Sequence, residues 1–274
     1  MRRPRLVGAA AVLASGGLGV ALLATLGAPS RLVLMNLGAT VVAAALAPLL
    51  VVAGRQVWRR ADVALIGAAV LLWLTALWGA DLDGVQRWAR VGPLLFHVGF
   101  LVLPVALIAL PHARVWVGLA SLAAIAAALV VQPDGGVALA FAAGVAGLAL
   151  RERSRIALAS LAIAGVGSVV AWLQPDPLPA VAFVEGVAAL AVERGLATGL
   201  LAILALGAPW LLLALAGRRV GGAAATGFWL GAVAASLIGN FPTPIAGGGV
   251  TPILAYALTW ALLAARPEEP ARPT

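Results

Sequence analysis

The chain has 274 residues, of which 63% are hydrophobic and 10% are charged. Soluble domains contain roughly 45–50% apolar residues, so a soluble globular protein is excluded. The net charge is +8 and all 18 basic residues are Arg, which suits the short cytoplasmic loops of a membrane protein better than a nucleic-acid surface. Because the chain contains no Cys, disulfides and thiolate chemistry are excluded as well.

Ten apolar segments follow one another along the chain, separated by charged or Pro- and Gly-rich breaks. A bilayer crossing needs about 20 apolar residues, and a lipid-exposed backbone must satisfy its own hydrogen bonds. The sequence therefore predicts an all-α polytopic membrane protein with about ten transmembrane helices. We expect one transmembrane domain over 1–274, with a short cytoplasmic tail at 266–274. The segments run over 6–26, 32–53, 61–79, 93–110, 115–131, 137–150, 156–173, 195–216, 220–239 and 250–265.

The arginines predict the orientation of these segments. If the N-terminus is cytoplasmic, fourteen arginines fall on the inner side and four, at positions 31, 87, 90 and 194, fall on the outer side. The positive-inside rule then places both termini in the cytoplasm. A second interpretation makes residues 1–30 a cleaved signal peptide, although their apolar run is longer than the 7–15 residues that are usual there.

The acidic residues fall mainly on the predicted outer side. Asp134, Glu185 and Glu193 are embedded in apolar sequence, where an ionisable side chain is costly and is a functional candidate. The acids of the outer loops at positions 81, 83 and 176 are interpreted as solvated loop residues. His97 begins an apolar helix, and we expect it to hydrogen-bond to a neighbouring helix. No short spacing of His and carboxylates predicts a metal site.

Three stretches of the predicted outer face carry a family resemblance. Residues 84–92 read Gly-Val-Gln-Arg-Trp-Ala-Arg-Val-Gly and are followed by Phe96, which resembles the G-x-x-R-W-x-x-x-G and F-Q-P-S-E patterns of the SEDS family, the FtsW/RodA/SpoVE peptidoglycan polymerases. Residues 132–136, Gln-Pro-Asp-Gly-Gly, are similar to the family's Q-P-D-x-G. Residues 248–256 resemble its G-I-P-L-P-F-I-S-Y, and Asn240 and Pro242 precede them where the family has N and L-P.

A fourth match concerns the catalytic position of the family. In SEDS proteins a catalytic Asp stands eight residues before a Glu, and here Glu185 stands eight residues before Glu193. Two features depart from the pattern: His97-Val98-Gly99-Phe100 replaces Q-P-S-E, and the long extracellular loop of the family is short. The alternative for Glu185 is that its carboxylate caps a short interfacial helix.

The resemblance implies a glycosyltransferase that polymerises a lipid-linked disaccharide-peptide at the outer face of the bacterial cytoplasmic membrane. Glu185 would be the base, and Arg87 with Arg90 would bind the pyrophosphate. Asp134 would orient a helix end or a divalent ion such as Mg²⁺ or Mn²⁺; no other cofactor is implied. Further substrate-binding candidates are Trp88, Glu193, Pro252 and Tyr256. An expected partner is a single-span penicillin-binding transpeptidase.

Three other interpretations stay open. The chain could be a non-catalytic SEDS-like scaffold for cell-envelope or division enzymes. It could be an unrelated small-molecule or lipid transporter, although no internal repeat of the kind expected for transporters is found. The stretch Arg87-Trp88-Ala89-Arg90 could be a plain interfacial anchor, because Trp and Arg both favour the headgroup zone. We also expect small residues to mediate helix packing, with Gly144, Gly147, Gly165 and Gly167 facing neighbouring helices.

Overall fold

The apolar segments form helices in a computed structural model, which describes residues 2–216 and 220–265. Most of the helices begin or end at the predicted Arg, Pro or Gly breaks, because each break supplies a loop that can leave the apolar layer. The tail at 266–274 lies outside the described residues. The helices are α1 (Arg2–Thr25), α2 (Ser30–Arg59), α3 (Ala61–Trp78), α4 (Val98–Ala109), α5 (Val115–Val131), α6 (Gly135–Glu152), α7 (Arg155–Leu173), α8 (Val187–Glu193), α9 (Leu196–Ala216), α10 (Val220–Ile238) and α11 (Val250–Ala264).

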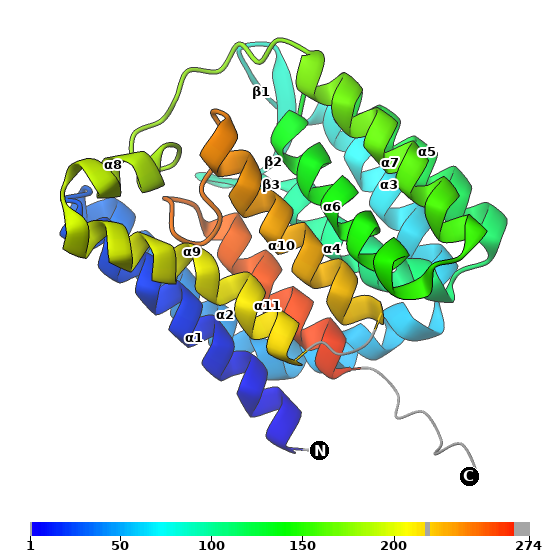
Figure 1. Ribbon diagram of the computed structural model, residues 1–274, viewed down its shortest axis with the longest axis horizontal. Helices are drawn as coiled ribbons and strands as arrows, with labels where there is room; N and C mark the ends of the chain where they lie inside the picture. The colour runs from blue at the N-terminus through cyan, green and yellow to red at the C-terminus, as the bar shows by residue number, and fades with distance from the viewer. Residues whose placement is uncertain (1, 217–219, 266–274) are drawn as a thin grey trace.

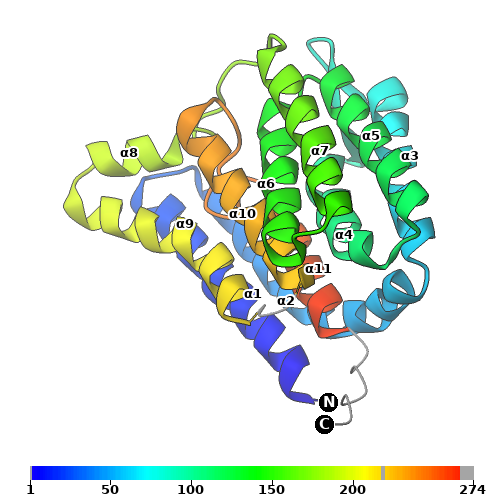
Figure 2. The same cartoon turned by 45° about the vertical axis from the view of Figure 1, so that its right-hand side comes forward.

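The helices other than α8 run alternately up and down one bundle (Figure 1). Helices α10 and α11 lie in its middle, with α1, α2 and α9 on one side and α3, α5 and α7 on the other (Figure 2). The two ends of the bundle differ in their loops. The end that carries the strands and residues 174–186 and 239–249 is called the sheet end. The opposite end, with residues 55–60 and 151–155, is called the arginine end.

Seven described helices are long and apolar enough to cross a membrane, and three shorter apolar helices, within Val98–His112, Val115–Val131 and Val250–Ala264, accompany them. The chain is therefore a multi-pass, all-α membrane protein, as the sequence predicts. The exact number of ten crossings and the side on which the termini lie are not settled by helix length and stay predictions. The single domain over 1–274 is likewise a prediction.

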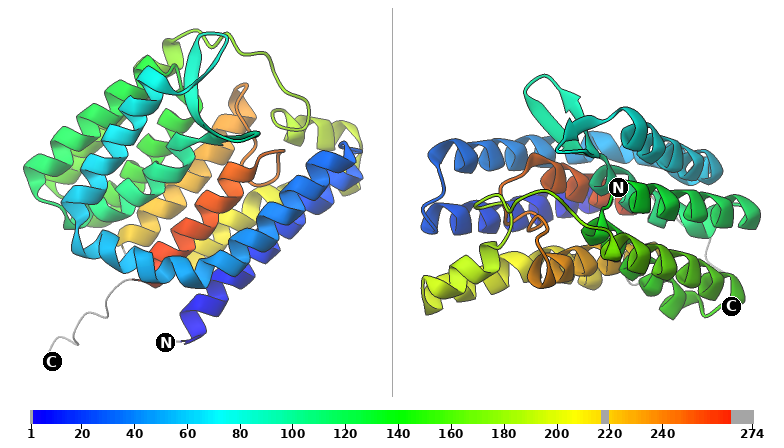
Figure 3. Two further views of the ribbon diagram at one scale, coloured as in Figure 1. Left: turned by 180° about the vertical axis from the view of Figure 1, so that it is seen from behind. Right: turned by 90° about the horizontal axis from the view of Figure 1, so that it is seen from above.

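A small sheet that the sequence analysis does not foresee covers part of the sheet end. Strands β1 (Ala80–Leu82), β2 (Val85–Val91) and β3 (Leu94–His97) pair antiparallel in the order β1-β2-β3. It is seen from behind and from above in Figure 3. Asp83 and Gly84, between β1 and β2, both have positive φ, at 50° and 84°. An Asp-Gly pair is the usual sequence of such a tight hairpin turn, so this turn was detectable.

Glycines set the distance between the central helices. A Cβ on Gly147 of α6 would clash with the carbonyl oxygen of Ala223 on α10, and a Cβ on Gly144 would clash with Leu107 of α4. A Cβ on Gly167 would lie 2.6 Å from the Cβ of Ala126. These three positions face neighbours as predicted. The prediction for Gly165 is wrong, because no atom of a neighbour lies within 4 Å of a Cβ there.

The two glycine environments give a matched pair of variants. Gly147→Ala is expected to lower the melting temperature in detergent by several degrees, since overpacking against a backbone atom costs about 1–3 kcal/mol. Gly165→Ala adds the same methyl group to open space and gains helix propensity, so its melting temperature should stay equal or rise. Equal melting temperatures for both variants would contradict the close α6–α10 contact.

Candidate functional site

A cavity of about 40 Å³ lies at the sheet end, between the sheet, the start of α6, residues 174–186 and the loop at 239–249. Its lining includes four of the predicted site residues: Arg87, Trp88, Asp134 and Glu185. They come from three separate parts of the chain, which the fold brings to one place. The cavity is therefore the candidate functional site.

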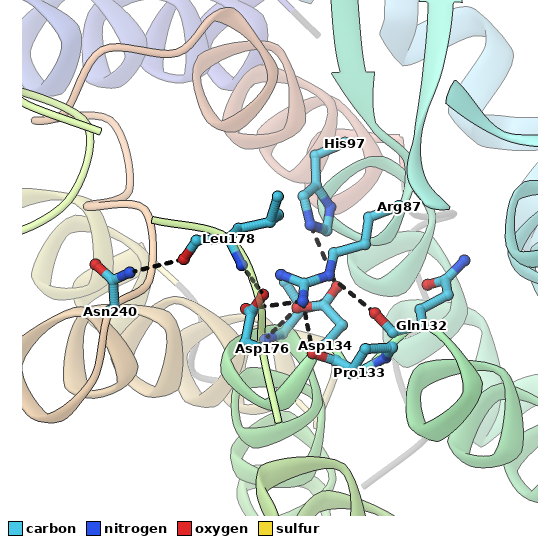
Figure 4. A network of polar contacts seen from close by, with 9 residues as sticks. Arg87, His97, Gln132, Pro133, Asp134, Asp176, Leu178 and Asn240 are labelled. Atoms are coloured by element: carbon cyan, nitrogen blue, oxygen red, sulfur yellow. Dashed lines mark hydrogen bonds and ion pairs between the residues drawn. The ribbon is translucent and has the colours of Figure 1, made fainter. Parts of the chain in front are cut away.

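Arg87 is the centre of the polar network in this cavity (Figure 4). Alternation along β2 turns Val85 and Arg87 into the protein, and Arg87 is only 4% exposed. Its Nε donates to the carbonyl oxygen of Gln132 at 2.9 Å, and its Nη2 donates to that of Pro133 at 2.7 Å. The same Nη2 lies 2.8 Å from Oδ2 of Asp176. Arg87 therefore joins the sheet to two loops, and its burial does not fit the role of an interfacial anchor.

Asp134 and His97 form a second buried pair. Asp134 is the N-cap of α6, where its Oδ1 accepts a hydrogen bond from the backbone N of Val137. Nε2 of His97 lies 3.2 Å from the other carboxylate oxygen, Oδ2. Burial raises the pKa of Asp134, but His97, the charge of Arg87 and the Val137 N–H outweigh burial and hold this pKa below its ordinary value. Asp134 therefore orients the start of α6, which is one of the two roles that the sequence analysis gives it.

The ring of His97 is held firmly in place. It packs edge-on against Trp88 and Phe100, with ring centroids 5.6 and 5.4 Å away, and its backbone N donates to Oγ1 of Thr251 on α11. The expected polar contact of His97 with a neighbouring helix is therefore present. Nδ1 is buried and has no hydrogen-bond partner among the described residues.

Glu185 lies on the loop side of the cavity and is half-buried. Its Oε2 accepts a hydrogen bond from the backbone N of Val181 at 2.5 Å. Burial raises the pKa of Glu185, the Val181 N–H lowers it, the charge of Asp176 raises it, and the net effect is a raised pKa. The N-cap of α8 is Gly186, which makes no side-chain capping bond. The alternative in which Glu185 caps this short helix is therefore wrong.

Four predicted site residues lie away from the cavity. Arg90 is exposed on β2, and Glu193 is exposed at the end of α8. Pro252 is buried in α11. Tyr256 is 1% exposed, and its hydroxyl donates to the carbonyl oxygen of Pro209 on α9 at 3.0 Å. The structure does not bring these four residues together with Glu185, and their roles in binding stay predictions.

Two cavity residues were missed as site candidates. Asp176 was interpreted as a solvated loop acid, but it pairs with Arg87. Asn240 donates from Nδ2 to the carbonyl oxygen of Leu178 at 3.4 Å and so connects two loops across the cavity. The match of Asn240 to the family pattern was a usable signal for its position. The pairing of Asp176 with Arg87 could not be predicted, because an ion pair between distant loops produces no recognisable residue spacing in the sequence.

The charges of the lining restrict the chemistry of the site. The described lining carries one Arg, one His and three carboxylates, those of Asp134, Asp176 and Glu185. No group of three or more His or acidic side chains among the described residues is arranged to hold a metal ion. The residues suit proton transfer by a carboxylate and binding of an anion by a guanidinium.

Comparisons with known proteins identify the fold. The crystal structure of the rod shape determining protein RodA of Thermus thermophilus is similar, with a TM-score of 0.67, 22% sequence identity and 93% of each chain covered. A point variant of the same RodA gives a TM-score of 0.64, at the same identity and over 93% of this chain and 94% of that one. A chain from a structure of a peptidoglycan synthase complex that coordinates polymerisation and crosslinking gives a TM-score of 0.60. The sequence identity is 22%, and 93% of this chain and 95% of that one are covered.

No protein-family model matches the chain, and no curated protein matches it significantly in sequence. The structural likeness nevertheless covers nearly the whole chain. The class defined by these observations is a polytopic membrane protein with the RodA fold. This agrees with the SEDS resemblance that the motifs around Trp88, Asp134 and Gly248 indicate.

Proposed function

We propose that the protein is a SEDS-like peptidoglycan glycosyltransferase that polymerises a lipid-linked disaccharide-peptide. The observation that carries this proposal is the position of Arg87, Asp134 and Glu185 around one cavity of a RodA-like fold. In the sequence these residues belong to three motifs that resemble the SEDS family. Their convergence on one cavity supports a common role, because motifs matched by chance would have no reason to lie together in the fold.

The proposed reaction assigns each of these side chains a task. The hydroxyl oxygen of the acceptor sugar attacks the anomeric carbon of the donor, and the bond from that carbon to the diphosphate breaks. Glu185 accepts the hydroxyl proton, and its raised pKa makes it a better acceptor than an ordinary glutamate. The diphosphate leaves with the bonding electron pair, and Arg87 offsets its charge. Asp134 positions the start of α6.

We propose further that the sheet end faces outward from the bacterial cytoplasmic membrane. Ten of the fourteen arginines at described positions lie at the arginine end, and four, at positions 31, 87, 90 and 194, lie at the sheet end. The positive-inside rule then places the arginine end in the cytoplasm.

The absence of native Cys makes this orientation directly testable. An impermeant maleimide should label Ala89→Cys, which is exposed on β2, in intact cells. Gln56→Cys, exposed at the arginine end, should react only after lysis. The reverse pattern would overturn the orientation.

A second candidate function is a non-catalytic scaffold. It is favoured by the engagement of Arg87 with three oxygen partners and by the small size of the cavity. Purified protein and a fluorescent lipid-linked disaccharide-peptide distinguish the two functions. An enzyme should form polymer alone or with a co-expressed single-span transpeptidase, which is the partner we propose. No polymer under either condition would contradict the enzyme and support the scaffold.

A further inference from the structure

The cavity at the sheet end is narrow in this structure. Its volume of about 40 Å³ accommodates one or two water molecules, whereas ligand pockets usually measure about 300–1,000 Å³. Asp176, Leu178 and Pro179 form part of its cover. A sugar or a diphosphate therefore enters only after this cover moves. The cover, residues 174–180, is called the strap.

The strap is attached much more weakly than the residues that follow it. Its first residue, Gln174, donates from its backbone N to the carbonyl oxygen of Ala171 at the end of α7. Beyond that residue, two polar contacts in the described structure hold the strap to other elements: the Arg87–Asp176 ion pair and the long hydrogen bond from Asn240 to Leu178. The next residues, by contrast, are fixed by backbone hydrogen bonds. The N of Thr243 donates to the carbonyl oxygen of Val184 at 2.8 Å, and the N of Gly248 donates to that of Phe183 at 2.6 Å.

The composition of the strap suits movement as one piece. Prolines at positions 175, 177 and 179 fix their own φ angles and donate no backbone hydrogen bond. Most strap residues are exposed, and the side chain of Asp176 is 25% exposed although its partner Arg87 is buried. The strap can therefore swing away at little cost in buried apolar surface, once the ion pair is broken.

We infer that Arg87 is a phosphate-anion site masked by Asp176, and that a diphosphate opens the strap by replacing the Asp176 carboxylate on the guanidinium. This inference rests on the proposed function for the source of the diphosphate, but the site itself follows from the contacts. A planar guanidinium binds carboxylate and phosphate oxygens in the same geometry. When the strap leaves, it removes one of the three carboxylates of the lining, which lowers the repulsion that an arriving anion meets.

The position of the strap can be measured without catalytic turnover. Spin labels at Ala180→Cys on the strap and Ala89→Cys on β2 give one distance, since both positions are exposed and the chain has no other Cys. The protein without ligand should give one short distance distribution. Inorganic pyrophosphate should add a longer distribution, and sodium chloride at equal ionic strength should not. A short-chain polyprenyl diphosphate, as a second arm, tests whether the lipid-linked form acts better than the free anion.

Three variants test the role of Asp176. Asp176→Asn should raise the long-distance population several-fold without pyrophosphate, and Asp176→Glu should restore the short distance. Asp83→Asn, at an exposed turn of the same sheet, should behave like the parent protein. The inference is overturned if pyrophosphate leaves the distance unchanged, or if Asp176→Asn stays closed while remaining monodisperse and helical. If the protein forms polymer while the strap does not move, the proposed opening of the strap is overturned and the proposed function stays intact.

Discussion

Glu185→Gln is expected to lower polymer formation by about 10²–10⁴-fold, the usual cost of losing one general base. Gln keeps the size of the side chain and can still accept the hydrogen bond from the backbone N of Val181, so the fold should survive. Glu185→Asp keeps a carboxylate and should retain part of the activity. Asp83→Asn removes an exposed carboxylate from the same end of the molecule and should leave the rate unchanged.

The pH dependence of the same reaction follows from the pKa of Glu185. Burial raises this pKa above its ordinary value of 4.5, and the base acts only when it is deprotonated. The rate should therefore rise with pH across a range above that value. The raised pKa also means that folding binds the proton more tightly, so the stability contribution of Glu185 is present at low pH and is lost as the pH rises through the folded-state pKa. A rate that is independent of pH across this range, or the same profile in Glu185→Gln, would contradict the role of the base.

Arg87→Met is expected to destabilise the protein by about 3 kcal/mol, because removal of one member of a buried charge network leaves its partners unpaired. The carbonyl groups of Gln132 and Pro133 lose their donor, and Asp134 loses a neighbouring positive charge. From the sequence alone, a change at Arg87 would be expected to weaken donor binding without unfolding the protein. The burial of this side chain at 4% exposure changes that expectation.

The control for Arg87 is Arg90→Met, three residues further along β2, where the side chain is exposed. Exposed charges typically contribute 0–1 kcal/mol, so this variant should melt within a degree or two of the parent. The comparison requires thermal unfolding of both variants in the same detergent. If both melt at the parent temperature, the network around Arg87 does not hold the sheet end together.

The sequence predicts the helices well because each one is a long apolar run between polar breaks. It also gives Asp134 as a residue that orients a helix end or a divalent ion, and in the structure Asp134 is the N-cap of α6. The sheet was missed because its strands are short and lie between two apolar helices. The Asp83–Gly84 turn was the available signal.

The site was predictable only in part. Residues within a motif, such as Arg87 and Asp134, could be selected from local pattern. Tyr256 was selected by the same reasoning, but α11 turns it into the bundle, where it contacts α1 and α9. The Asp176 partner of Arg87 depends on how a loop 89 residues further along the chain folds back over the sheet, and local sequence contains no record of that contact.

Photocrosslinking to the cavity tests the central claim most directly. A benzophenone amino acid in place of Phe241, which lines the cavity, should crosslink to a fluorescent lipid-linked disaccharide-peptide. The same amino acid in place of Trp116, exposed near the arginine end, should not. The account predicts a crosslink at Phe241 that excess unlabelled donor removes. A protein that forms polymer but crosslinks only at Trp116, or equally at both positions, would contradict the assignment of the site.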